Sequence, residues 1–193
     1  MSIYLYNSID RFFINHFIGI KETGIYSVSI QLGLFVSLMF VSFNTAFTPF
    51  LFRQLSENVS KMRKTFKIIF FGLLLASIAS LVFYLISPFF EGLIIDEKYH
   101  KAIGYLPLII LTQLFMGSQM IFGNFLFYFE KTKIIALLSF STLVLNALLT
   151  YVFIPKYGEI GAALSSTISA AVYFLLTFIL SVNQLIKKQS DAV

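Results

Sequence analysis

Residues 66–90 read FKIIFFGLLLASIASLVFYLISPFF, an apolar run in which Lys67 is the only charged residue. At about 1.5 Å rise per residue, a helix of this length crosses the roughly 30 Å hydrocarbon core of a bilayer. A strand of a membrane β-barrel would instead be a segment of about 10 residues with alternating polarity. The run therefore predicts a transmembrane α-helix.

The composition of the whole chain supports a membrane protein. Of 193 residues, 58% are hydrophobic and 12% are charged, and the mean hydropathy is +0.87. Soluble domains carry roughly 25% charged residues, and one globular core of this length cannot bury so much apolar surface. The chain contains no cysteine, which excludes disulfides and thiolate metal sites.

Similar apolar runs recur along the chain and are joined by short polar segments. With the run above they make six candidate spans, and the first of them is the weakest because it contains two charged residues. We therefore predict an all-α membrane protein in which residues 1–193 form a single lobe of six transmembrane helices. The expected spans are about 3–20, 25–52, 66–90, 103–129, 134–154 and 160–185.

The distribution of lysine and arginine predicts the orientation of these spans. If the N-terminus is cytoplasmic, the inner segments hold nine of the 14 basic residues and the outer loops hold four. The positive-inside rule then places both termini in the cytoplasm, and the scattering of the charges argues against a nucleic-acid partner. The inner residues are Arg53, Lys61, Arg63, Lys64, Lys67, Lys131, Lys133, Lys187 and Lys188, and the outer ones are Lys21, Lys98, Lys101 and Lys156.

Tyrosines lie near the ends of several runs. A phenol has an apolar ring and a polar hydroxyl, which suits the boundary between hydrocarbon and water. We therefore expect interfacial positions for Tyr26, Tyr99, Tyr105, Tyr128 and Tyr157.

The first span carries an acid and a base side by side, Asp10 and Arg11. Helical spacing places Arg11 on a polar stripe with Asn7 and Asn15, and Asp10 lies beside this stripe. Adjacent residues on a helix point about 100° apart, so each charge can find its partner on another helix. Charged residues within a span are rare and mark functional sites, so both are candidates.

Other spans also carry polar side chains on one face. The candidates for a polar cavity are Gln31, Asn44, Gln113, Asn124 and Asn146. The alternative is that such groups only hydrogen-bond neighbouring helices, at roughly 0.6 kcal/mol each. The sixth span instead carries two rows of small residues, which predict close helix packing: Gly161, Ser165 and Ser169, and Ala162, Ser166 and Ala170.

Motifs for catalysis or metal binding are missing from the sequence. Its two histidines, His16 and His100, are far apart, and it has no nucleophile motif, no phosphate-binding loop and no paired acids at helical spacing within a span. We therefore expect neither an enzyme nor a cofactor or metal site.

Three stretches together resemble one family. The first, SIDRFFINHFIGIKETGIYSVSIQLG at 8–33, is similar to the seventh and eighth helices of polysaccharide transporters of the Wzx type, with their D-R pair and a later GxY. The second, KTKIIALLSFSTLVLNALLTYVFIP at 131–155, resembles a later helix with a K-T-K entry and a mid-span Asn. The third, PKYGEIGAALSSTIS at 155–169, resembles the turn before the last helix.

This resemblance implies membership of the multidrug/oligosaccharidyl-lipid/polysaccharide exporter superfamily. It implies a flippase that moves oligosaccharide linked to undecaprenyl diphosphate across the bacterial inner membrane for surface polysaccharide synthesis. Such transporters have two lobes of six spans around a central cavity. Arg11 matches the arginine of the D-R pattern, and the resemblance implies that it meets the anionic substrate.

Six spans correspond to the second lobe alone, and one lobe cannot enclose a substrate. We therefore expect a partner: a missing N-terminal six-span lobe, another half-chain or a second copy. The start of the chain at a helix favours a truncated product or a fragment. Two alternatives remain open, half of a cation-coupled multidrug exporter, for which Asp10 is the buried acid, and a non-transporting membrane assembly partner.

Overall fold

The structure, a computed structural model, describes residues 2–57, 62–90 and 99–190. Its helices agree with the predicted all-α class, and no strand occurs among the described residues. Within these ranges the elements are α1 (Ser2–Phe17), α2 (Ile20–Glu57), α3 (Met62–Ile86), the 3₁₀ helix η2 (Ser87–Phe90), α4 (Lys101–Tyr128), α5 (Thr132–Tyr157) and α6 (Glu159–Ser190).

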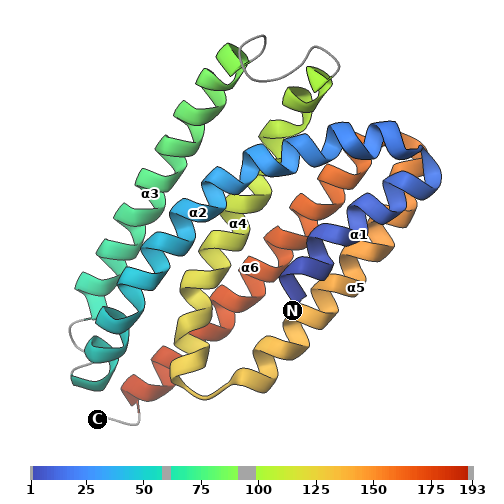
Figure 1. The fold of residues 1–193 in the computed structure, drawn as a ribbon. Helices are drawn as coiled ribbons and strands as arrows, with labels where there is room; N and C mark the ends of the chain where they lie inside the picture. Colours follow the sequence, from blue (N-terminus) through green and yellow to red (C-terminus); the bar gives the residue numbers. More distant parts are fainter. Residues whose placement is uncertain (1, 58–61, 91–98, 191–193) are drawn as a thin grey trace.

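The helices pack side by side in one bundle (Figure 1). α6 lies between α4 and α5 and packs extensively against both, and α2 packs along α4. α1 folds back from α2 and lies along α5, whereas α3 makes few contacts and lies at the edge beside α2. α4 and α6 therefore form the centre of the bundle, and α1 and α3 lie on its periphery.

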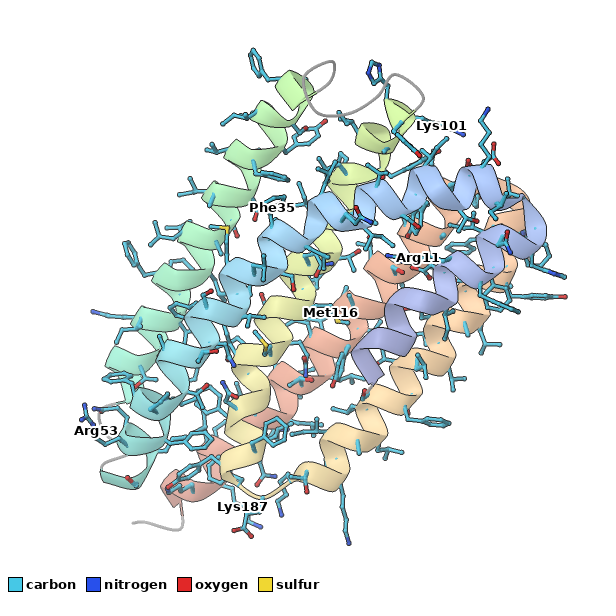
Figure 2. The ribbon with its side chains drawn as sticks, in the orientation of Figure 1. Arg11, Phe35, Arg53, Lys101, Met116 and Lys187 are labelled. Carbon is cyan, nitrogen blue, oxygen red and sulfur yellow. The ribbon has the colours of Figure 1, made fainter. Side chains whose placement is uncertain are left out.

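The outer surface of the bundle is apolar. Five of the described helices, α2 to α6, are long and apolar enough to cross a membrane, whereas α1 has 16 residues. Large side chains such as Phe70, Leu81 and Phe89 are exposed on the surface. Figure 2 shows Arg53 and Lys187 at one end of the bundle and Lys101 at the other. An apolar belt between charged ends identifies a multi-pass membrane protein.

The turns between helices are shorter than the polar segments of the sequence suggest. α1 and α2 are separated only by Ile18 and Gly19, and α5 and α6 only by Gly158. Gly19 has φ +132° and Gly158 has φ +61°, which are conformations that side-chain-bearing residues rarely adopt. Polar residues such as Lys21 and Lys156 therefore extend the helices beyond the apolar runs. Both turns lie at one end of the bundle, which we call the outer end after the charge prediction (Figure 1).

The predicted close packing of the sixth span is confirmed. All six small residues of its two rows are buried, and a Cβ on Gly161 would collide with the backbone of Phe153 in α5. The helices also exchange hydrogen bonds across this region: Thr112 of α4 and Thr167 of α6 join hydroxyls at 2.9 Å. Small side chains let the backbones approach, which is how helices associate without a hydrophobic driving force.

A lysine joins three helix ends at the opposite, inner end. The ammonium of Lys188 in α6 donates to the Leu55 carbonyl of α2 at 2.8 Å and to the Tyr128 hydroxyl of α4 at 3.2 Å. It also lies 4.8 Å from the centroid of the Tyr128 ring, within the range of a cation–π interaction. The carbonyl at the end of α2 thus gains a cationic donor.

Candidate functional site

Asp10 lies at the point where α1 meets three other helices. Its side chain is 3% exposed. The hydroxyl of Tyr26 in α2 donates a hydrogen bond to Asp10 Oδ2 at 3.3 Å. The hydroxyl of Thr150 in α5 donates one to Asp10 Oδ1 at 3.4 Å. Ser166 of α6 also donates to Oδ2. The carboxyl group therefore finds its partners on helices other than its own, as predicted from its position beside Arg11 on one helix.

A fifth residue, Asn146 of α5, completes this group, which we call the Asp10 cage: Asp10, Tyr26, Asn146, Thr150 and Ser166. Its amide donates to Ser166 Oγ at 3.1 Å. Its Oδ1 is buried and has no hydrogen-bond partner. Three hydroxyl donors satisfy an ionised Asp10, and the free acceptor of Asn146 beside them suits a protonated one. The cage can therefore accommodate both protonation states.

The Asp10 cage lies in the outer part of the bundle. Asp10 is seven residues before the end of α1 at Phe17, and Thr150 is seven before the end of α5 at Tyr157. Ser166 is seven after the start of α6 at Glu159. Seven residues of helix measure about 10 Å. The three helices therefore place their cage residues at one depth, which explains how positions 140 and 156 residues away in sequence reach Asp10.

Arg11 points away from the cage because successive helical residues are turned by about 100°. Its side chain is half-buried, and its Nε is buried with no hydrogen-bond partner. Figure 2 labels Arg11 on α1, on the side of the bundle that faces the viewer. A guanidinium with an unused donor is available for an anionic ligand such as a phosphate.

Two of the remaining predicted site residues, Asn44 and Asn124, join helices, whereas the others do not contact Asp10 in the described part of the chain. Asn124 of α4 donates to Asn44 Oδ1 at 2.7 Å and to Thr48 Oγ1 at 3.1 Å, so it joins α4 to α2. Gln113 is half-buried on α4, whereas Asn15 and Gln31 are exposed. The side chain of Asn7 lies outside the described part. Among the predicted amides whose side chains the structure describes, only Asn146 comes together with Asp10.

The prediction of interfacial positions for Tyr26 and Tyr105 did not reveal that both side chains are buried between helices. Tyr26 is 0% exposed and Tyr105 is 3% exposed, because both lie in the apolar cluster where α2 packs on α4. Sequence reasoning also missed Ser166 as a polar contact, since that residue belongs to a small-residue row. Spacing along one chain segment could not identify Tyr26 and Ser166 as site residues, because each contacts Asp10 from a different helix.

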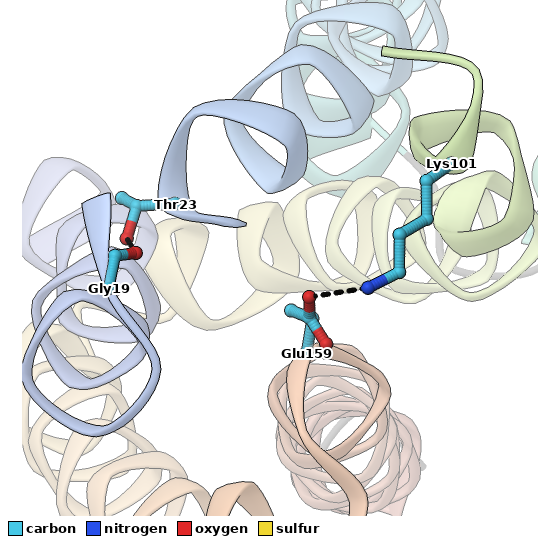
Figure 3. Close-up of polar contacts among 4 residues, drawn as sticks. All are labelled: Gly19, Thr23, Lys101 and Glu159. Carbon is cyan, nitrogen blue, oxygen red and sulfur yellow. Dashed lines mark hydrogen bonds and ion pairs between the residues drawn. The ribbon is translucent and has the colours of Figure 1, made fainter. Parts of the chain in front are cut away.

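An ion pair joins α4 to α6 at the outer end of the bundle, beyond the Asp10 cage. Lys101 Nζ at the start of α4 lies 2.8 Å from Glu159 Oε1 at the start of α6 (Figure 3). The side chain of Lys101 is 58% exposed and that of Glu159 is 11% exposed. Lys101 Nζ also lies 5.9 Å from the centroid of the Tyr105 ring. Among the described residues, no group of three His, Cys, Asp or Glu side chains could hold a metal ion.

Comparison with known proteins matches this chain to a protein family and to relatives in bacteria. The family model described as MatE matches residues 1–152, which include Asp10, Arg11, Asn146 and Thr150. "Lsg locus putative protein 1" of Haemophilus influenzae is 28% identical over 181 residues, which cover 90% of this chain and 44% of that protein. "Putative O-antigen transporter" of Shigella flexneri is 26% identical over 177 residues, which cover 86% of this chain and 40% of that protein.

The chain thus spans less than half the length of these curated relatives. No solved structure matches it. The matched residues cover most of the helices described above, so the similarity concerns the bundle as a whole.

Proposed function

Because the chain belongs to the MatE family, we propose that it is one lobe of a flippase that moves lipid-linked oligosaccharide across a bacterial cytoplasmic membrane. Undecaprenyl diphosphate is the proposed lipid carrier, and surface polysaccharide synthesis is the proposed purpose. Its multi-pass helical bundle and the O-antigen transporter among its relatives support this function. The proposed orientation has both termini in the cytoplasm, in agreement with the positive-inside rule.

The observation that carries the proposal is the different environment of two adjacent charges. Asp10 is satisfied by three hydroxyl groups inside the bundle, whereas Arg11 keeps a buried Nε without a partner. A buried guanidinium donor without a partner is costly in a membrane bundle unless a ligand compensates it. A diphosphate offers pairs of oxygens that can accept two hydrogen bonds from the planar guanidinium. We therefore assign Arg11 to the diphosphate of the lipid carrier.

We assign Asp10 to the coupling of transport to a proton gradient. Its cage offers donors to the ionised carboxylate and a free acceptor, Asn146 Oδ1, to the protonated acid. Because Asp10 and Arg11 are neighbours on α1, a change in hydrogen bonding at Asp10 shifts the helix that carries Arg11. α1 is well placed for such a shift since it lies at the periphery of the bundle.

The chain needs a second lobe to enclose a substrate, because transporters of this kind move two repeats against each other. The proposed partner is an N-terminal lobe of six spans, another half-chain or a second copy. The relatives are more than twice as long as the matched region, which favours a lobe supplied in the same polypeptide.

Complementation of a strain that lacks its own flippase tests the proposal. The complete two-lobed protein with Arg11→Ala should restore no surface polysaccharide at normal membrane levels, and Arg11→Lys should restore part of it because the charge remains but the planar geometry is lost. The exposed Arg53→Ala is the matched control. Normal polysaccharide with Arg11→Ala contradicts the assignment.

Drug efflux measured in the same cells distinguishes the alternatives. Resistance to cationic drugs that disappears with Asp10→Asn, without any polysaccharide phenotype, would identify a multidrug exporter. Absence of both phenotypes in a stable complex with biosynthetic proteins would identify an assembly partner.

A further inference from the structure

We propose that the Asp10 cage exchanges protons with the outer end of the bundle through Tyr26 and Tyr105, beneath the Lys101–Glu159 ion pair. The inference rests on the proposed role of Asp10 in coupling and adds the side from which the proton enters. It also assigns positioning roles to two tyrosines and an ion pair that the flippase function does not by itself require.

Depth within the helices favours the outer end. Asp10, Thr150 and Ser166 lie about 10 Å from that end by helix rise. In the other direction, 18 residues separate Thr150 from the start of α5 at Thr132, which is about 27 Å. A route to the outer end is therefore less than half as long as a route to the inner end.

Two tyrosines lie along the shorter direction. Tyr105 is four residues into α4, or about 6 Å deep, and Tyr26 is six residues into α2, or about 9 Å deep. Their ring centroids are 6.1 Å apart, and the Tyr26 hydroxyl contacts Asp10 Oδ2 at 3.3 Å. At the outer end, Lys101 Nζ lies 5.9 Å from the centroid of the Tyr105 ring. Side chains thus connect the exposed ion pair to the carboxyl group.

The Tyr105 hydroxyl is the feature that suggests transfer and not only packing. It is buried and makes no hydrogen bond of good geometry, although it lies close enough to Lys101 and Glu159 to interact with both. A buried hydroxyl without a hydrogen bond of good geometry costs stability, up to about the value of a lost hydrogen bond. A phenylalanine would fill the same space without that cost. A functional role of the hydroxyl therefore accounts for a tyrosine at this position. Proton relay is a role that the position of Tyr105 allows.

The proton balance of the route is simple. A proton that reaches the Tyr26 oxygen from the Tyr105 side releases the hydroxyl proton of Tyr26 to Asp10 Oδ2. Tyr26 ends unchanged, and the carboxyl gains one proton. The protonated carboxyl can then donate a hydrogen bond to Asn146 Oδ1. The titratable or charged side chains along the line are Asp10 and Arg11 on α1, Tyr26 on α2, Lys101 and Tyr105 on α4, and Glu159 on α6; the α5 residues Asn146 and Thr150 do not titrate.

Sided cysteine labelling tests the access route directly, because the chain has no cysteine of its own. A membrane-impermeant cationic methanethiosulfonate is applied to Tyr105→Cys in spheroplasts and in inverted vesicles. We expect labelling from the outer side only. Tyr157→Cys, exposed at the outer end, is the positive control, and Ile109→Cys, one turn deeper on α4, should stay unlabelled. Labelling of Tyr105→Cys from the cytoplasmic side, or from neither side, overturns the route.

Opening of the ion pair supplies a second measurement. In Tyr105→Cys, the additional change Glu159→Gln should speed outer labelling about two- to fivefold, the change expected for a partly exposed ion pair. An unchanged rate would remove the ion pair from the proposal.

Tyr105→Phe separates relay from packing. The variant keeps the ring and loses only a hydroxyl without a hydrogen bond, so a packing role predicts unchanged protein level and unchanged transport. A relay role predicts transport slowed on the order of tenfold or more, with the loss greatest at high external pH, whereas Tyr157→Phe stays normal. Transport equal to wild type at every pH overturns the relay.

Labelling requires no substrate, so the two proposals fail separately. Outer labelling with no polysaccharide phenotype for Asp10→Asn would contradict the flippase function and leave the access route standing. Labelling of Tyr105→Cys from the cytoplasmic side, together with a polysaccharide defect for Asp10→Asn, would contradict the access route and leave the flippase function standing.

Discussion

Replacing Asp10 in two ways distinguishes a hydrogen-bonded cage from a charge that holds α1 by attraction. Asp10→Asn keeps an oxygen that accepts from the hydroxyls of Tyr26 and Ser166, and it adds an amide donor that can reach Asn146 Oδ1. Asp10→Ala removes every acceptor. We therefore expect the asparagine variant to be close to wild type in stability and the alanine variant to be clearly less stable.

The magnitude follows from the three hydrogen bonds that Asp10 accepts. Interhelical hydrogen bonds in membrane bundles average about 0.6 kcal/mol, so their joint loss in Asp10→Ala costs about 2 kcal/mol. This lowers the folded-to-unfolded ratio roughly 30-fold. Ser166 and Thr150 can redirect their hydroxyls to carbonyls of their own helices, which prevents a larger cost. For Asp10→Asn we expect a loss below about 1 kcal/mol.

The assay is the free energy of unfolding in lipid bicelles, measured for wild type and both variants. Thr142→Ala is the control, since its buried hydroxyl bonds only the Leu138 carbonyl of its own helix. Equal destabilisation by Asp10→Asn and Asp10→Ala would refute the reasoning, because it would mean that negative charge and not hydrogen bonding holds α1. No effect of Asp10→Ala would show that the cage contributes nothing to stability.

Three further substitutions test the packing, and two of them have a matched control variant on the same helix. Gly117→Val drives a side chain into the ring of Phe40 where α4 meets α2, so thermal unfolding should show a loss of about 1–3 kcal/mol, whereas Gly104→Ala, in open space on the same helix, should gain about 0.8 kcal/mol. Asn124→Leu removes both amide bonds to α2 and should cost about 1 kcal/mol in the same measurement. Lys188→Met loses the donor to α2 and should speed backbone hydrogen exchange at the inner end of α2, an effect that Lys187→Met, at a neighbouring position, should lack.

Much of the architecture is visible in residue order alone. The long apolar runs predict helices because a bilayer solvates apolar side chains but offers no hydrogen-bond partners to the backbone. The backbone groups must therefore bond one another within the helix. The family resemblance, which rested on the D-R pair and on the turn around Gly158, is confirmed by the MatE match. The helix ends were harder to place, because polar residues at the turns continue the helices once their side chains reach water.

The site was only half visible. Asp10 and Arg11 stand out because charges within a span are costly, but sequence periodicity placed Asp10 beside a polar stripe and could not say that it is buried. Tyr26 was expected at the membrane interface because it lies near the end of an apolar run. The tight turn at Gly19 returns α2 against α1, so a residue near a helix end becomes an interior one.

The sequence by itself determined the class of the protein, its family and the presence of two charges inside a span, because these depend on composition and on local helical spacing. Only the tertiary structure decided what the charges contact. Asp10, Thr150 and Ser166 lie at the same depth on α1, α5 and α6, so they meet although more than 100 residues of chain separate Asp10 from the other two. The turn of about 100° between successive helical residues directs Arg11 away from them. Contacts between helices depend on how the helices are packed, and helical spacing within one span carries no record of that.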